Sequence, residues 1–273
     1  MKTRHLLLFL VLLSPVIRAE TQTDLEYGKA AGESLKLDLR VPDEDGPFPV
    51  CILVHGGGWS KGDKQKQVKP LFAPLTAAGF AWVSINYRLA PAHKYPDSVE
   101  DLETAIRWVK AHAGQYHLDA MRIALIGESA GGHLVALVGT QAKEDLRVAA
   151  VVPFYAPTDL VTALAAEKGN PSPAAAAYFG VSEDNDATRK LLREASPMTY
   201  VKPGLPPFLL LHGTADQLVP YDQSVKFLAK LKAAKVAAEL ITIQDGRHGM
   251  ANWEKLNSDY AKQVVAWLNQ TLK

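Results

Sequence analysis

The sequence has almost no cysteine. Cys51 is the single cysteine in 273 residues, so no disulfide can form within one chain. It lies in the apolar run 50–54, where we expect a small buried side chain. A chain of this length buries enough apolar surface to fold without disulfides.

The sequence also lacks an excess of either charge. It has 30 Lys and Arg residues against 29 Asp and Glu residues, a net charge of +1. Nucleic-acid binding depends on a surplus of basic residues, so we expect no nucleic-acid partner. No His, Cys, Asp and Glu residues have the spacing of a zinc site, and we expect neither a metal nor another cofactor.

Long hydrophobic runs are absent as well. The longest, 6–13, has eight apolar residues, whereas a transmembrane helix needs about 20. Basic residues precede it, Ser14-Pro15 follows it, and Ala19 offers a small residue for cleavage. This pattern predicts a signal peptide over 1–19 and export to the periplasm or medium, without a stable membrane anchor. An uncleaved anchor and a buried first helix are the alternatives. Cleavage would leave 27 basic against 29 acidic residues.

Strand-like and helix-like segments alternate along the rest of the chain. Continuous apolar runs predict strands buried on both faces, and amphipathic stretches predict helices. The expected strands are 34–41, 50–54, 80–86, 123–126, 148–154, 207–211 and 238–243. The expected helices are 66–78 (interrupted near two prolines), 97–112, 130–141, 221–234 and 253–272. This order predicts an α/β fold with a mostly parallel sheet and helices on both faces.

Two segments depart from that alternation. Residues 20–32 are polar and predict a loop. Residues 157–201 are rich in alanine, proline and charge, and predict short helices that form a lid or cap above the sheet. We expect 20–273 to be one catalytic domain that includes this insert.

The segment Gly127-Glu128-Ser129-Ala130-Gly131 lies between a predicted strand and a predicted helix. In that context Gly-x-Ser-x-Gly is typical of a sharp turn that exposes a nucleophilic serine at the edge of a sheet. The flanking glycines lack Cβ atoms, so the strand and the helix can approach closely. A chance match is the alternative. Glu128 is either a solvated turn residue or an acid that supports the site.

A serine nucleophile needs a base and a carboxylate that orients the base. His248 is the only histidine after residue 212 and lies in a glycine-flanked loop behind a strand. Asp216 follows the strand 207–211 and precedes His248 by 32 residues, whereas Asp245 is too close to His248. We therefore predict Ser129, Asp216 and His248 as the catalytic residues. A surface histidine and a turn cap are the alternatives for the last two, and we interpret His212 and His133 as structural.

Attack on an acyl carbon also needs N–H donors for the developing oxyanion. The glycines at 56–58 follow the buried strand 50–54, and their backbone can turn inward without a side-chain clash. Together with the N–H of Ala130 they predict an oxyanion hole. A plain flexible turn is the alternative.

At this point the chain resembles an α/β-hydrolase of the esterase/lipase group, related to hormone-sensitive lipases and similar to bacterial feruloyl-esterase-like and acetyl-esterase-like members. The resemblance implies that Ser129, Asp216 and His248 form a triad, with Gly57, Gly58 and Ala130 as oxyanion donors and Gly56 as a further candidate. It covers roughly 33–270. The matching motifs are His55-Gly56-Gly57-Gly58-Trp59, Tyr87-Arg88-Leu89-Ala90-Pro91, Gly127-Glu128-Ser129-Ala130-Gly131-Gly132 and His212-Gly213-Thr214-Ala215-Asp216.

The chain departs from that group in two respects. Residues 20–49 are too short for a helical cap, so 157–201 is expected to provide the roof. The sequence of residues 216–220 resembles that of dienelactone hydrolases and oligopeptidases more than that of the lipase group. The resemblance implies a serine carboxylic-ester hydrolase that acts through an acyl-enzyme on small-molecule or carbohydrate esters, with short acyl, acetyl or feruloyl groups. An amidase, formamidase or peptidase is the enzymatic alternative, and a non-catalytic binding protein is the other.

Overall fold

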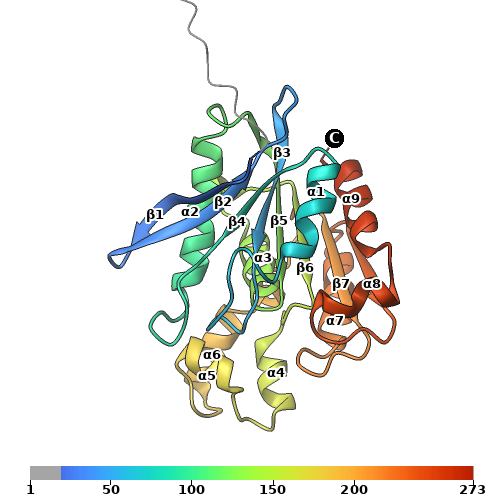
Figure 1. The fold of residues 1–273 in the computed structure, drawn as a ribbon. Coiled ribbons are helices and arrows are strands. Elements are labelled where there is room, and N and C mark those ends of the chain that lie inside the picture. The colour runs from blue at the N-terminus through green and yellow to red at the C-terminus, as the bar shows by residue number, and fades with distance from the viewer. Residues whose placement is uncertain (1–19, 273) are drawn as a thin grey trace, which may run out of the picture.

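The computed structural model describes residues 20–272, so the predicted signal peptide lies outside the described residues. Eight strands form one sheet in the order β1-β2-β4-β3-β5-β6-β7-β8 (Figure 1). The pairs β1–β2 and β2–β4 are antiparallel, and the other pairs are parallel. The strands are β1 (Gln22–Ala30), β2 (Glu33–Arg40), β3 (Phe48–Val54), β4 (Ala81–Ile85), β5 (Leu118–Glu128), β6 (Ala150–Phe154), β7 (Phe208–Gly213) and β8 (Ala238–Ile243).

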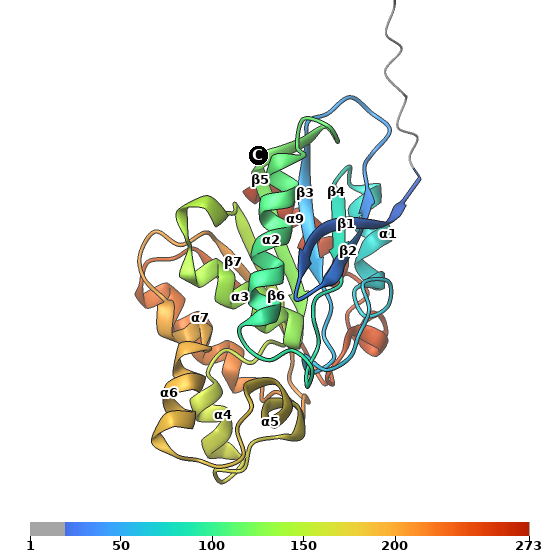
Figure 2. The same cartoon turned by 90° about the vertical axis from the view of Figure 1, so that its left-hand side faces the viewer.

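Helices cover both faces of this sheet. They are α1 (Phe72–Ala77), α2 (Asp97–Ala111), α3 (Ala130–Gln141), α4 (Leu160–Ala166), α5 (Pro173–Phe179), α6 (Asp186–Glu194), α7 (Asp222–Ala233), α8 (Trp253–Leu256) and α9 (Tyr260–Thr271). Short 3-10 turns are η1 (Lys69–Leu71), η2 (Glu144–Leu146), η3 (Pro197–Tyr200) and η4 (Met250–Asn252). Figures 1 and 2 show α2 and α3 on one side of the sheet and α1 and α9 on the other. The predicted mostly parallel α/β architecture is confirmed.

Two apolar cores lie on the two faces of the sheet. Alternate residues of β3 point to opposite sides, so Val50 and Ile52 pack with α2 and α3, whereas Cys51 and Leu53 pack with α1 and α9. All four side chains are fully buried. Because β3 is buried on both faces, every position of its run 50–54 is apolar, as the sequence predicts. Cys51 is buried for the same reason.

The prediction of a loop over 20–32 is wrong, because 22–30 forms β1. This strand lies at the edge of the sheet and pairs only with β2, so all but one of its residues are half-buried or exposed and can be polar. Irregular pairing after Gln22 and after Glu26 also breaks the period-two pattern that identifies a strand in sequence.

Two predicted helices are shorter or divided. The segment 66–78 folds as η1 followed by α1, because Pro70 and Pro74 interrupt a continuous helix. The closing helix is divided into α8 and α9. Among the described residues, no helix is both long and apolar enough to cross a membrane.

The segment 157–201 contains α4, α5, α6 and η3 and no strand, as the sequence predicts. In Figure 1 these helices lie beyond the end of the sheet toward which the parallel strands point. Ligands of parallel α/β sheets bind at this carboxyl edge. The insert is therefore on the correct side of the sheet to cover a site there.

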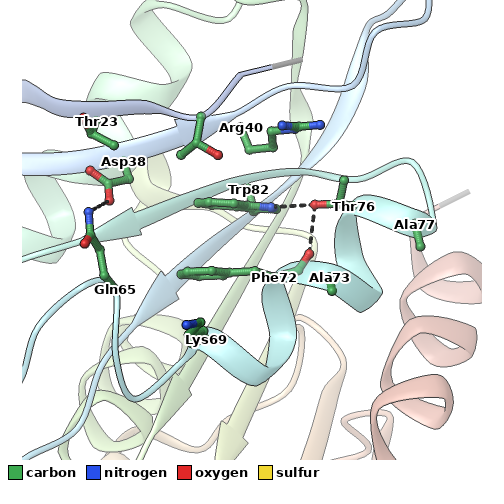
Figure 3. A pocket seen from close by; sticks show the side chains of 11 residues that line it. Thr23, Asp38, Arg40, Gln65, Lys69, Phe72, Ala73, Thr76, Ala77 and Trp82 are labelled. Carbon is green, nitrogen blue, oxygen red and sulfur yellow. Dashed lines mark hydrogen bonds between the residues drawn. The ribbon is translucent and has the colours of Figure 1, made fainter.

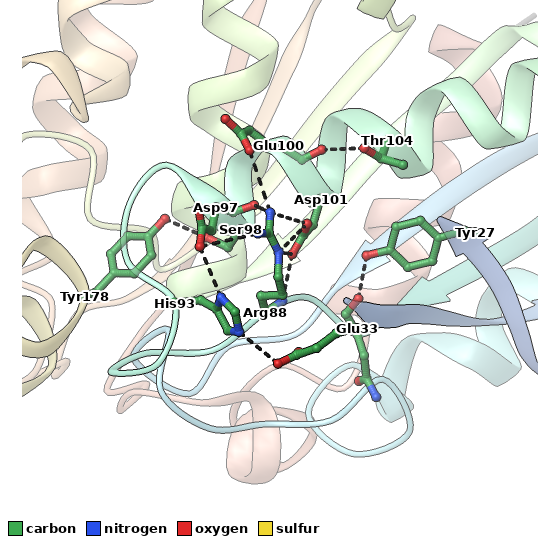
Figure 4. Close-up of polar contacts among 11 residues, drawn as sticks. Tyr27, Glu33, Arg88, His93, Asp97, Ser98, Glu100, Asp101, Thr104 and Tyr178 are labelled. Carbon is green, nitrogen blue, oxygen red and sulfur yellow. Dashed lines mark hydrogen bonds and ion pairs between the residues drawn. The ribbon is translucent and has the colours of Figure 1, made fainter. Parts of the chain in front are cut away.

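A buried ion pair holds the loop 86–96 between β4 and α2 (Figure 4). The Arg88 guanidinium contacts Asp101 at 2.8–3.0 Å, and both side chains are buried. His93 bridges Glu33 at 3.0 Å and Asp97 at 3.2 Å, which ties the loop to the β2 hairpin. The Ala90 N–H donates to the Trp59 carbonyl oxygen at 2.9 Å, which fixes this loop against the segment that follows β3.

Candidate active site

Ser129 occupies a strained turn between β5 and α3. Its φ of 53° and ψ of −116° lie in a region that residues with a side chain rarely adopt. A Cβ atom on Gly127 would lie 2.3 Å from the Gly131 carbonyl oxygen, and one on Gly131 would lie 2.2 Å from the Val54 carbonyl oxygen. Only glycine fits at these two positions. The close approach of three backbone segments keeps the serine turned out of the strand.

The structure brings Ser129, His248 and Asp216 together in one line of hydrogen bonds. His248 Nδ1 lies 2.7 Å from Asp216 Oδ2, and His248 Nε2 lies 2.8 Å from Ser129 Oγ. A carboxylate accepts hydrogen bonds, so the proton belongs on Nδ1 and Nε2 carries a lone pair toward the serine hydroxyl. Asp245 lies close to His248 in the sequence. Its backbone N–H donates to Thr214 Oγ1 instead.

Asp216 is held as a carboxylate. Its Oδ1 accepts the N–H groups of Leu218 and Val219 at 2.9 and 3.0 Å, and its Oδ2 contacts His212 as well as His248. Burial acts to raise the pKa of Asp216, but the hydrogen bonds from His212, His248 and the Val219 N–H outweigh it. The pKa of Asp216 is therefore well below its usual value.

His212 has a structural position, as the sequence predicts. Its Nε2 lies 2.9 Å from the carbonyl oxygen of Val219 and 3.3 Å from Asp216 Oδ2, so Nε2 carries the proton. Its Nδ1 lies 2.7 Å from Ser224 Oγ. The buried ring thus joins β7, the loop after Asp216 and α7.

The glycine loop after β3 lies beside the serine turn. Gly57 and Gly58 have φ values of 106° and 60°, which explains why both positions are glycine. In the described part of the chain, no hydrogen-bond acceptor is found for their two N–H groups. Ala130 is the first residue of α3, so its N–H has no carbonyl of a preceding helical turn to bond.

Glu128 is the carboxylate that holds this loop. Its Oε1 accepts the N–H of Gly56 at 2.6 Å. It is buried, and burial raises its pKa. The two interpretations of Glu128 are thus resolved: it supports the site and is not a solvated turn residue. Gly56, whose N–H is taken, is not an available oxyanion donor.

His133 links three parts of the site that the sequence did not connect. Trp59 Nε1 donates to His133 Nδ1 at 3.2 Å, and His133 Nε2 donates to the Ala195 carbonyl oxygen at 2.7 Å. The fully buried ring joins the glycine loop, α3 and the end of α6. The sequence predicted only local packing for it, because Ala195 is 62 residues away.

Helix α5 lies directly over the glycine loop. The Trp59 ring stacks on Tyr178 with centroids 5.0 Å apart and contacts Phe179 edge-on at 5.5 Å. Tyr178 is fixed in turn by Ser98 at 2.6 Å. A Cβ atom on Gly58 would lie 3.0 Å from the methyl group of Ala174. This half-buried alanine therefore bounds the space beside Gly58.

Among residues 20–272, no three His, Cys, Asp and Glu side chains are grouped as a metal ion would require. The chemistry that the site offers is that of a hydroxyl, an imidazole and a carboxylate. Such a set can carry out nucleophilic acyl transfer with the histidine as acid and base.

Known proteins resemble this chain in sequence and in fold. The family model BD-FAE matches residues 37–231. A Mycobacterium tuberculosis protein named "Probable carboxylic ester hydrolase LipM" is 36% identical over 222 residues, which are 77% of this chain and 51% of that protein. The chain spans about half the length of the curated relatives it matches.

Two solved structures extend over nearly the whole chain. A truncated carbohydrate esterase from gut microbiota has a TM-score of 0.81 at 24% identity and covers 95% of this chain and 98% of its own. An acetyl ester-xyloside bifunctional hydrolase from Caldicellulosiruptor lactoaceticus has a TM-score of 0.78 at 25% identity and covers 94% and 97%. These similarities confirm the α/β-hydrolase fold.

Replacing Glu128 tests its support of the loop. Glu128→Ala leaves the buried N–H of Gly56 without its acceptor, and we expect a loss of about 1–3 kcal/mol in the free energy of unfolding. Glu128→Gln keeps an oxygen for Gly56 and should lose less. Urea denaturation measures both, and equal stabilities of the two variants would refute this role.

Two buried histidines predict a pH dependence of stability. Burial lowers the pKa of His55 and of His133 to about 4, below the usual 6.5. The unfolded chain therefore binds protons first, and stability should fall as the pH drops from 6.5 toward 4, by at most about 3 kcal/mol for each histidine. In denaturation experiments at several pH values, the free energy of unfolding should change less with pH in His133→Gln than in the unchanged protein. Replacement of the exposed His117 by Gln is the matched control, and an equal change in both variants would contradict the assignment.

Proposed function

This chain belongs to the BD-FAE family, and we propose that it is a serine carboxylic-ester hydrolase that uses Ser129, His248 and Asp216. The observation that carries the proposal is the line of hydrogen bonds from Asp216 through His248 to a serine held in a strained turn. The names of the sequence relatives, which are esterases and carboxylic ester hydrolases, favour the same activity.

Each proposed step follows from the positions of the three side chains. His248 Nε2 takes the hydroxyl proton of Ser129 as Oγ attacks the ester carbonyl. Asp216, kept ionised, stabilises the imidazolium that results. His248 then gives the proton to the departing alcohol, which leaves an acyl group on Ser129. Water, deprotonated by His248, attacks the acyl-enzyme and regenerates the serine.

The oxyanion of each tetrahedral intermediate needs donors that are already in place. We assign this role to the N–H groups of Gly57, Gly58 and Ala130. Glu128 supports it by fixing Gly56, the residue before the two donors in the loop. The contacts of Trp59 with His133 and Tyr178 fix the other end of the same loop. A loop held at both ends does not have to reorganise when charge develops.

The insert 157–201 is proposed as the roof of the substrate site. Ala174 of α5 contacts the position that a Gly58 side chain would occupy, so the space beside the proposed oxyanion hole is narrow. Narrow space favours short acyl groups such as acetyl, and two structural neighbours, a carbohydrate esterase and an acetyl ester-xyloside hydrolase, support carbohydrate-linked esters as substrates. We also propose that the protein is exported, because residues 1–19 have the pattern of a signal peptide.

Removal of the proposed nucleophile tests the mechanism. Ser129→Ala should lower kcat on p-nitrophenyl acetate by at least about 10³-fold with the fold retained, because no other group then forms the acyl-enzyme. Labelling with a fluorophosphonate probe should disappear in parallel. Ser34→Ala, at an exposed serine of β2, is the control and should keep full activity. Undiminished hydrolysis by Ser129→Ala would overturn the assignment.

A panel of substrates tests the proposed narrow site. We expect the highest kcat/KM on acetyl esters, less on octanoyl esters, and little on N-formyl or peptide amides. Ala174→Leu should lower kcat/KM on the longer acyl esters about tenfold more than on acetate, since the larger side chain fills space beside Gly58. Ala187→Leu on the exposed face of α6 is the matched control. Equal effects of Ala174→Leu on all acyl lengths would show that α5 does not limit the acyl group.

A further inference from the structure

A cavity lies at the edge of the sheet that β1 and β2 form (Figure 3). It has a volume of about 610 Å³ and is bounded by β1, β2, β4 and α1. None of the residues that line it belongs to the proposed catalytic set. They are Thr21, Thr23, Asp38, Arg40, Gln65, Lys69, Phe72, Ala73, Thr76, Ala77 and Trp82. We call it the Arg40 cavity.

The alternation of β2 places two of its charged residues, Asp38 and Arg40, in this cavity. Leu37 and Leu39 face the core that contains α2, so Asp38 and Arg40 point to the other side. Arg40 pairs directly with Trp82 of β4 across the antiparallel ladder. The short helix α1 covers only part of this face, and the remaining space is the cavity.

The negative charge of the cavity is already satisfied. Asp38 Oδ1 contacts Lys64 Nζ at 2.9 Å and accepts the Asp24 N–H at 2.9 Å, and its Oδ2 accepts Gln65 Nε2 at 2.8 Å (Figure 3 shows the last bond). A carboxylate with these partners has little capacity left for a cationic ligand.

The positive charges of the cavity are not satisfied. Within residues 20–272, Arg40 Nε is buried without a hydrogen-bond partner, and neither Arg40 nor Lys69 forms a salt bridge. Arg40 and Lys69 both line the cavity, so their positive charges are available to a ligand there, although the covered Nε atom itself is not. The groups of this cavity that remain free to bind a ligand are therefore the positively charged hydrogen-bond donors of Arg40 and Lys69.

The aromatic wall of the cavity is flat and apolar. Phe72 and Trp82 stack with ring centroids 4.2 Å apart and an interplanar angle of 4°. Trp82 Nε1 donates to Thr76 Oγ1 at 3.0 Å, and Thr76 Oγ1 donates to the Phe72 carbonyl oxygen at 2.8 Å (Figure 3). The polar atoms of this wall are thus paired with one another, and the wall offers a ligand apolar contact.

We propose that the Arg40 cavity binds a small monocarboxylate with a flat apolar body. A guanidinium matches the two oxygens of a carboxylate, and Lys69 adds a second positive charge at the same cavity. The flat apolar body of the ligand would pack against the wall that Phe72 and Trp82 form. The site is separate from the proposed esterase chemistry and does not depend on it.

Calorimetric titration of the full chain with benzoate tests the proposal. Benzoate should bind with saturation, whereas acetate, which lacks the flat body, and benzyl alcohol, which lacks the charge, should bind at least about tenfold more weakly. Inorganic phosphate tests charge alone and should also be weaker. Binding of phosphate or acetate as tight as that of benzoate would overturn the proposed ligand class.

Two variants locate the binding. Arg40→Gln should weaken benzoate binding about tenfold or more, because a charge-assisted hydrogen bond is lost. Lys69→Gln, at an exposed position that does not threaten folding, should weaken it less but measurably. Arg193→Gln on the outside of α6 is the control for loss of one positive charge. Benzoate binding that is unchanged in both Arg40→Gln and Lys69→Gln would refute the site.

Discussion

The close approach of backbone around Ser129 is the constraint on which the site depends. Gly127 and Gly131 leave no room for a side chain, so β5 enters α3 through one tight turn. The turn puts the serine hydroxyl at the carboxyl edge of the sheet, where the loops after β3, β7 and β8 also begin. A larger residue at Gly127 would push α3 away from β5, and one at Gly131 would push α3 away from the end of β3, so the proposed donor at Ala130 would be displaced.

Buried polar groups transmit this geometry to the loops. The carboxylate of Glu128 fixes the glycine loop, His133 connects that loop to α3 and α6, and His212 with two backbone N–H groups holds Asp216. Each of these groups is buried and hydrogen-bonded, so moving one leaves another unpaired in a medium of low polarity. The rigidity of the proposed catalytic set therefore comes from paired polar side chains as much as from apolar packing.

Much of the fold follows from local pattern, whereas the support of the site does not. The bounds of α3 and β8 agree with the prediction, because an apolar run or a helical period defines each of them. Ser129, Asp216 and His248 follow strand ends in a known order, and the structure brings them together. The partner of Glu128 lies 72 residues away, so no local pattern reveals that bond. β1 was missed because an edge strand needs neither an apolar face nor a regular period.

The same edge explains how a second site can exist on a small domain. An antiparallel hairpin extends the sheet at β1 and β2 beyond the area that α1 covers, and one face of β2 is left without a core to pack against. A charged residue there cannot join the apolar interior, and in this face Asp38 is buried and Arg40 is half-buried. The charge of Asp38 is neutralised by its ion pair with Lys64. Arg40 has no such partner among the described residues, which makes a bound anion the arrangement that would complete this face of the sheet.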